Sequence, residues 1–188
     1  MLEVCKSGEI KLVQLLLERC NSEEIGLNIK NRLGRTPFME ACSNGHKEIV
    51  QLLLDCSDRI ELNVRDCHGS TALMIACANG DKDVVKLLLD NSERIELNAI
   101  DHHGSTAFMI ACQNGDKDVV KLLLANSERI DLNASNKYEG TAFMMACQNR
   151  HSDVVQLLLE HSDIIELNAK NSNGMTAFMM ACQNGLSD

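Results

Sequence analysis

Cysteines are the residues whose type and spacing in this sequence most suggest chemistry. Six of the nine occupy one column of a repeating pattern: Cys5, Cys42, Cys77, Cys112, Cys147 and Cys182. A disulfide needs Cα atoms within about 7 Å, whereas equivalent residues of packed neighbouring repeats lie ~8–10 Å apart. A structural zinc needs four converging ligands, which a single column does not supply. We therefore predict that the column consists of small buried packing residues.

A second group of metal-binding residue types lies in the predicted turns. Cys67 and His68 align with His102 and His103 one repeat later. Imidazoles from adjacent turns can meet over a transition metal, but this spacing matches no known ligand pattern. We therefore interpret these residues as surface or partner-contacting residues and expect no metal.

Enzymatic chemistry is not favoured by any motif. No repeat holds a Ser/His/Asp or Cys/His set that its sister repeats lack, and no glycine-rich loop suited to phosphate occurs. His46 and His151 precede predicted second helices, which suggests capping or surface roles. We therefore expect no catalytic residue and no cofactor.

A threonine marks the same motif at intervals of 35 residues: Thr36, Thr71, Thr106, Thr141 and Thr176. Self-similarity at a fixed period indicates stacked units, each of which buries its apolar face against its neighbours. We predict a single array over residues 1–188, without a linker or a low-complexity tract. Its predicted parts are an N-terminal capping repeat, four complete repeats and a truncated last repeat: residues 1–29, 30–64, 65–99, 100–134, 135–169 and 170–188.

Each repeat contains the signals of two short helices and a turn. In one copy, Thr71 is a good N-cap for a helix that runs through "ALMIACAN" and stops at Gly80. Asp81 can cap the next helix, "KDVVKLLLD", which has a broad apolar face. The following "NSERIELNA" alternates apolar and polar residues, which predicts an extended segment before the next turn.

Composition and charge exclude several classes of protein. The net charge of −9 argues against a nucleic-acid groove and weakly favours a partner with a basic patch. No stretch of eighteen apolar residues predicts a membrane span, and the N-terminus has no signal-peptide pattern. Nine cysteines without secretory features suggest reduced thiols, hence a cytoplasmic or nuclear location.

The repeating motif carries a family resemblance. The run T-[PA]-[LF]-M-x-A-C-x-N-G, then "VVKLLL" and "LNA-x-D-x-x-G-x-T", resembles the ankyrin repeat with its T-P-L-H-x-A signature, over essentially the whole chain. The resemblance implies an all-α solenoid of stacked helix-turn-helix units joined by β-hairpin-like fingers. Methionine stands where the family has histidine, so we expect thioether packing there. The period exceeds the usual 33 residues by two, which predicts a longer loop after the second helix.

The finger positions vary between repeats whose helical columns hardly change. The resemblance implies that fingers and first helices line a concave face that binds partners, which makes a protein–protein interaction scaffold the leading hypothesis. Neutral drift on exposed turns is the alternative reading. Tyr138, Arg32 and Arg35 are the best anchor candidates because interface hot spots favour Tyr and Arg. The predicted partner-binding residues are Arg32, Leu33, Arg35, His68, Ser70, His102, His103, Ser105, Lys137, Tyr138, Glu139 and Asn173.

Two other functions stay open, both encouraged by the C-terminus. The chain can be a structural spacer from a longer array, or a substrate-docking domain of a larger enzyme. "GLSD" (185–188) aligns with "RHSD" (150–153), so a second helix is due where the sequence stops. We expect Phe178, Met179 and Met180 to lack a covering helix. The oligomeric state we predict is a monomer or a weak end-to-end association through this uncapped repeat.

Two further expectations concern single positions. The resemblance suggests hydroxylation of asparagines that follow an acidic-Leu pair: Asn63, Asn98, Asn133 and Asn168. In the copy "KYEGTAFMMACQNR" (137–150), Glu139 and Arg150 stand where other repeats have glycine. A left-handed non-glycine residue costs about 1–2 kcal/mol. We therefore predict a reshaped finger and a strained helix end in this repeat.

Overall fold

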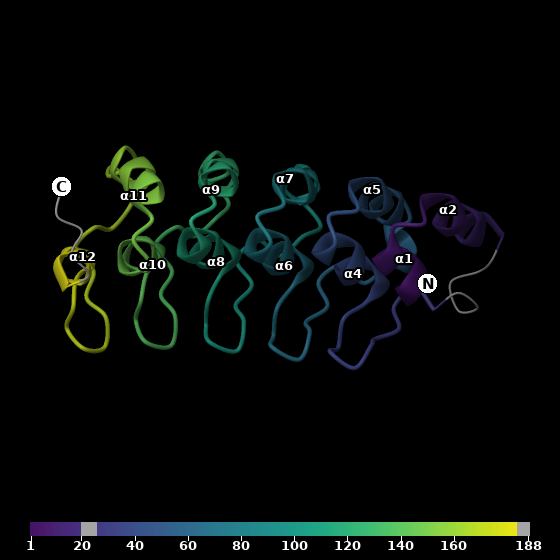
Figure 1. The fold of residues 1–188 in the computed structure, drawn as a ribbon, viewed down its shortest axis with the longest axis horizontal. Coiled ribbons are helices and arrows are strands. Elements are labelled where there is room, and N and C mark those ends of the chain that lie inside the picture. Colours follow the sequence, from purple (N-terminus) through teal and green to yellow (C-terminus); the bar gives the residue numbers. More distant parts are fainter. Residues whose placement is uncertain (20–25, 184–188) are drawn as a thin grey trace. The chain divides into compact units, whose positions relative to one another are not determined.

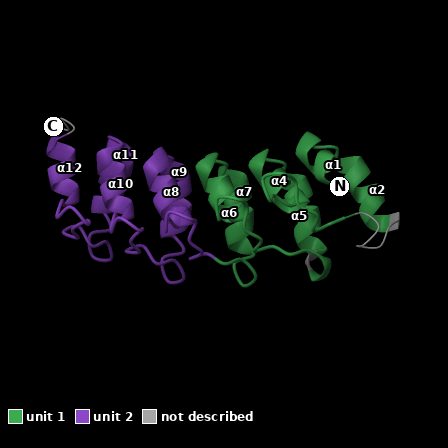
Figure 2. Ribbon diagram, turned by 90° about the horizontal axis from the view of Figure 1, so that it is seen from below, with its two compact units in different colours: residues 1–96 green, residues 97–188 purple. Residues whose placement is uncertain are grey.

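The computed structural model describes residues 1–19 and 26–183, which form two compact units. Unit 1 is Met1–Glu96 and unit 2 is Leu97–Asp188 (Figure 2). Within each unit the same pair of short helices recurs, with a finger before each first helix from α4 onwards (Figure 1). The described residues form helices and turns and include no strand, so the all-α helix-turn-helix prediction is confirmed.

In unit 1 the first helices of successive repeats pack on one another, and so do the second helices. The first helices are α1 (Leu2–Ser7), α4 (Pro37–Ser43) and α6 (Ala72–Ala78). The second helices are α2 (Ile10–Arg19), α5 (Lys47–Asp55) and α7 (Lys82–Asp90), and a 3-10 turn, η1 (Ser57–Arg59), follows α5.

Unit 2 is built in the same way, with α10 packed between α8 and α12 and with α9 packed on α11. Its first helices are α8 (Ala107–Asn114), α10 (Ala142–Gln148) and α12 (Ala177–Gln183). Its second helices are α9 (Lys117–Leu124) and α11 (Ser152–Leu159).

The repeated threonine begins every first helix after α1. Each threonine Oγ1 accepts a hydrogen bond from the methionine N–H three residues later, at 3.3–3.4 Å. This bond satisfies one of the amides that have no partner inside the helix. At Thr71 the backbone N–H also lies 3.5 Å from the Met74 Sδ, so the thioether closes the cap from the other side. The predicted caps at Thr71 and at Asp81, whose Oδ1 accepts from the Val84 N–H at 3.0 Å, are confirmed.

The cysteine column is part of the core, as predicted, except at Cys182, where the prediction of burial is wrong because that thiol is exposed. Its members from Cys5 to Cys147 are buried free thiols, and the methionines of the same motif are buried beside them up to Met144. Burial raises the pKa of the Cys5 thiol and of the Cys147 thiol to about 11. Burial, aided by the negative charge of Asp81, also raises the pKa of Cys42. These thiols are protonated, poorly nucleophilic packing residues.

Two details of the connections differ from the prediction. The segment expected to be extended, "NSERIELNA", is a turn in which Ile95 and Leu97 are both buried. Two apolar residues two positions apart can both be buried in the core from a turn as well as from a strand. In this segment the backbone forms a turn. The β-hairpin-like fingers are tight turns without strand pairing of their own.

Candidate functional site

Every finger is a turn organised by the side chain of its first residue. That side-chain oxygen accepts hydrogen bonds from the backbone N–H groups two and four residues later, at 2.8–3.0 Å. Short Asn and Asp side chains are suited to this role because they reach their own following backbone. The residues that organise the five fingers are Asn31, Asp66, Asp101, Asn136 and Asn171.

The fourth residue of each finger adopts a left-handed conformation. Four fingers have glycine there, whereas Glu139 takes a φ of 57°. Arg150, at the end of the helix α10, has a φ of 63°, so both predicted left-handed residues are confirmed. The prediction of a reshaped finger is wrong. The finger 136–140 makes the sister bonds, from the Asn136 N–H to the Gly140 O at 3.0 Å and from the Glu139 N–H to the Asn136 O at 2.9 Å. These turn bonds are enough to hold glutamate in the glycine conformation.

Neighbouring fingers within a unit are tied together by backbone hydrogen bonds. In unit 1 the Cys67 N–H donates to the Leu33 O at 2.8 Å. In unit 2 the Ser172 N–H donates to the Tyr138 O at 3.0 Å. The fingertips are therefore held in place before any partner binds.

The predicted partner-binding residues differ in exposure. Ser105 is buried, while Arg35 and Ser70 are half-buried. The other nine are exposed: Arg32, Leu33, His68, His102, His103, Lys137, Tyr138, Glu139 and Asn173. Tyr138 is 64% exposed and Leu33 is 47% exposed, so Tyr138 is the more exposed of the two large apolar side chains among them.

Arg35 is engaged within the fold of unit 1. Its Nε lies 3.3 Å from the Oδ2 of Asp66, and its guanidinium also reaches the Ser43 hydroxyl at 3.3 Å. Beside this ion pair, the Asn31 Nδ2 donates to the Glu40 Oε1 at 2.8 Å. In unit 1, the charged and amide side chains of the two fingers therefore bond to one another or to the adjoining helix α4.

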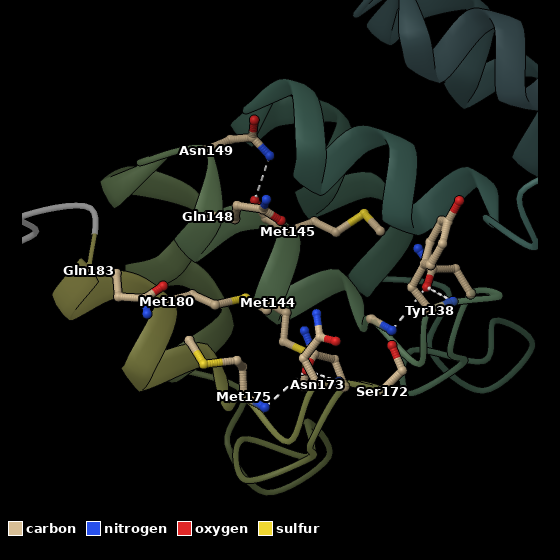
Figure 3. Close-up of a pocket in the computed structure, with 13 residues that line it drawn as sticks. Tyr138, Met144, Met145, Gln148, Asn149, Ser172, Asn173, Met175, Met180 and Gln183 are labelled. Carbon is tan, nitrogen blue, oxygen red and sulfur yellow. Dashed lines mark hydrogen bonds between the residues drawn. The ribbon is translucent and has the colours of Figure 1, made fainter.

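The matching finger pair of unit 2 borders an open groove (Figure 3). The cavity has a volume of about 590 Å³ and brings together two predicted residues, Tyr138 and Asn173. We call it the amide–methionine groove after the residues that line it: Asn136, Tyr138, Gly140, Met144, Met145, Gln148, Asn149, Asn171, Ser172, Asn173, Met175, Met180 and Gln183.

The first-helix part of this groove was missed by sequence reasoning. Met145 and Met180 occupy the column that holds Glu40, Ile75 and Ile110 in the other repeats. The change from glutamate to methionine in that column was the available signal. It was hidden because methionines recur throughout the motif and are mostly core.

The two histidines before second helices do not cap them with their side chains. The His46 Nε2 lies 2.9 Å from the Lys6 O, and the His151 Nε2 lies 2.8 Å from the Gln113 O. Each imidazole therefore connects its repeat to the C-terminal end of the first helix of the preceding repeat, α1 for His46 and α8 for His151.

The asparagines that follow the second helices form a ladder between loops. The Asn133 Nδ2 donates to the Ile164 O at 2.9 Å, and its Oδ1 accepts from the Glu166 N–H at 2.8 Å. Asn28, Asn63 and Asn98 make the same pair of bonds within their units. Three of these residues, Asn63, Asn98 and Asn133, were considered for hydroxylation, which stays a prediction.

No group of three or more His, Cys, Asp or Glu side chains converges on a possible metal position among residues 1–19 and 26–183. In that same part of the chain, no helix has the length and apolarity that crossing a bilayer requires.

The comparisons with known proteins agree with the repeat architecture. A family model described as ankyrin repeats (3 copies) matches residues 1–101, 58–136, 92–170 and 108–188, which together span the chain. A search of the curated proteins found no match. With its capped helix pairs, its fingers and this match over the full length, the chain belongs to the ankyrin repeat family.

Proposed function

We propose that this chain is a non-catalytic protein-binding module whose fingertips and adjoining first helices form the concave binding face. Ankyrin repeats are generally modules of protein–protein interaction and are typically non-catalytic. One observation carries the proposal: the fingers share one hydrogen-bonded turn, while the exposed residue at the third position is of four different types in the five fingers. These residues are Leu33, His68, His103, Tyr138 and Asn173.

Two properties of the fingers support this use. The turns and the bonds between neighbouring fingers fix the fingertips, which lowers the entropy that binding would otherwise cost. Tyr138 offers a large exposed ring of the kind enriched at interface hot spots. The net charge of −9 favours a partner that carries a basic patch.

The compartment that we propose is the cytosol or the nucleus. The cysteines of the described residues are free thiols, as expected in a reducing environment.

Affinity capture tests the binding proposal with one pair of substitutions in each unit. Arg32→Ala with His68→Ala removes exposed fingertips of unit 1, and His103→Ala with Tyr138→Ala removes those of unit 2. Lys86→Ala, on an exposed position of the second helix α7, is the matched control. A partner kept by the control should bind at least one fingertip variant more than tenfold more weakly in calorimetry. Equal binding by every variant, or capture of chaperones alone, contradicts the proposal and favours a spacer.

Weak self-association through the last repeat is the second interaction that we propose. Phe178 is 76% exposed and Met179 is 47% exposed, whereas the equivalent Phe108 and Met109 are buried. Exposed apolar surface of this kind favours association. Sedimentation velocity should show a concentration-dependent shift that Phe178→Ala removes. A shift that persists in this variant would place the contact elsewhere.

A further inference from the structure

The amide–methionine groove has a size suited to a bound side chain and its flanking backbone. Its volume of about 590 Å³ lies within the ~300–1,000 Å³ range of ligand sites. It runs from finger 136–140 to finger 171–175 along the exposed side of the helices α10 and α12 (Figure 3).

None of the 13 described residues that line the groove is charged. Lys137 and Glu139 neighbour Tyr138 in the sequence but are not among the lining residues. The same columns in unit 1 carry Arg35, Glu40 and Asp66. A charged ligand side chain placed in the groove of unit 2 would lose water without gaining a partner of opposite charge, which is unfavourable.

Two amide donors of the groove have no hydrogen-bond partner within the described part of the chain. The Asn136 and Asn171 oxygens organise their turns, but neither Nδ2 group donates a bond. In unit 1 the equivalent Nδ2 of Asn31 donates to Glu40. Because Met145 and Met180 replace that glutamate, the Nδ2 groups of unit 2 are available to carbonyl oxygens of a ligand.

The spacing of these donors fits an extended peptide. Equivalent residues of adjacent repeats lie ~8–10 Å apart, and an extended chain advances ~3.3 Å per residue, so about three peptide residues span the two fingers. In the same groove, the half-buried side chains of Met145, Met175 and Met180 offer adaptable apolar contact. Tyr138 adds an exposed ring at one end.

From this combination we propose that the groove binds an extended, uncharged peptide segment that places one large apolar side chain among the methionines. Carbonyl groups of the segment accept hydrogen bonds from Asn136 and Asn171. The proposal rests on the proposed protein-binding function and names the chemistry of the segment that enters this part of the binding face.

Substitutions borrowed from sister repeats test the proposal with little risk to folding. Met145→Glu restores the residue type of position 40, which brings a charge into the groove and gives the Asn136 amide a partner. Asn136→Asp with Asn171→Asp restores the residue type of positions 66 and 101, whose turns have the same bonds. Met145→Ile, the residue type of positions 75 and 110, is the matched neutral control.

The probe is a displayed library of random dodecapeptides, selected on the full chain and remade as acetylated, amidated peptides. The selected sequences should share an uncharged core around Leu, Met or Phe. Met145→Glu and the double Asp variant should each weaken their binding by about tenfold or more, and Met145→Ile by less than about threefold. Circular dichroism confirms that each variant is folded. If Met145→Glu unfolds, the double Asp variant decides.

Other outcomes separate this inference from the proposed function. The selected peptides could instead share a charged core and bind more weakly to Tyr138→Ala. That result would contradict the claim that the bound segment is uncharged, but it would still support the proposed binding function. If no selected peptide binds more weakly to Met145→Glu or to the double Asp variant than to the wild-type chain, the inference is overturned. If, in addition, the fingertip variants of both units capture every protein that the wild-type chain captures, with equal affinity, the proposed function is contradicted as well.

Discussion

The finger pair 31–35 and 66–70 of unit 1 and the finger pair 136–140 and 171–175 of unit 2 share one backbone design but differ in how their side chains are used. In both pairs an Asn or Asp side chain holds each turn, and a backbone bond joins the two fingers. In unit 1 the side chains around the turns bond to one another. In unit 2 they line an uncharged groove.

This difference shows that the turn and the surface beside it are independent features of the repeat. The turn requires a short acceptor at its first position and a left-handed residue at its fourth. Arg35 and Glu40 of unit 1 can therefore be replaced by Gly140 and Met145 in unit 2 without a change in the turn bonds. Freedom of this kind allows one repeat to stabilise the fold while another is available for a partner.

Backbone strain follows the same division. The described left-handed positions of unit 1 are all glycine, whereas unit 2 holds Glu139 and Arg150 in that conformation. Unit 2 therefore carries a conformational cost of about 1–2 kcal/mol at each site that unit 1 avoids.

Alkaline pH should produce the largest change in stability, with the greater share in unit 1. The Cys5 and Cys42 pKa values are raised by burial, that of Cys5 from 9.0 to about 11, so unfolded thiols ionise first as the pH rises above 9. Stability is full below pH 9 and is lost as the pH approaches 11. At pH 10 the loss is on the order of 1 kcal/mol for each of these thiols, and Cys147 of unit 2, whose pKa is also raised to about 11, adds a share of similar size.

Urea unfolding at pH 8 and pH 10 measures this loss. Cys42→Ala, which removes one of the three thiols with raised pKa values, should make the pH dependence shallower. If the free energy of unfolding is equal at both pH values, the thiols are not the buried groups described.

Removing the first finger residue should cost more in unit 1 than in unit 2. Asp66→Ala deletes two turn bonds and leaves the guanidinium of Arg35 without its carboxylate, which we expect to cost about 3 kcal/mol. Asn136→Ala deletes only the turn bonds and should cost about 1 kcal/mol. Thermal and urea unfolding of the two variants give the comparison. Equal losses would mean that the ion pair of unit 1 adds nothing.

Glycine at the two strained positions should stabilise unit 2. Glu139→Gly and Arg150→Gly relieve a left-handed conformation and should each raise the free energy of unfolding by about 1 kcal/mol. The control is Glu160→Gly, at the right-handed end of α11, which should destabilise instead. A loss of stability in both strained variants would show that contacts of Glu139 and Arg150 outweigh their backbone cost.

The smallest effect on stability is expected at the fingertip of unit 2. Tyr138→Ala removes a side chain that is 64% exposed, so the free energy of unfolding should change by no more than about 0.5 kcal/mol. A decrease of more than about 2 kcal/mol in the free energy of unfolding, measured with urea, would mean that this ring stabilises the fold and is not free to contact a partner.

The architecture of the repeats was predictable because it depends on local signals. The threonine caps, the buried cysteine column and the left-handed Glu139 and Arg150 follow from residue type and register alone. The loop at Ile95 and Leu97 was predicted wrongly, since alternation alone does not distinguish a strand from a turn that faces the core.

The groove was harder to predict because it depends on the absence, in unit 2, of the bond that the Asn31 amide makes to Glu40 in unit 1. Tyr138 and Asn173 stood out as variable fingertips, but the free Asn136 amide follows only from the loss of a glutamate nine residues later in the repeat, where Met145 now stands. Arg35 looked like an anchor by residue type, yet its bond to Asp66 depends on the packing of a neighbouring repeat.

Fluorescence of Tyr138 tests the central claim most directly, because the chain has one Tyr and no Trp. A selected peptide without aromatic residues is titrated into the wild-type chain and into Met145→Glu. If the groove of unit 2 binds an uncharged segment, the emission should change with saturation in the wild type and shift to at least tenfold higher peptide concentration in the variant. Identical titration curves for the two chains would contradict the account.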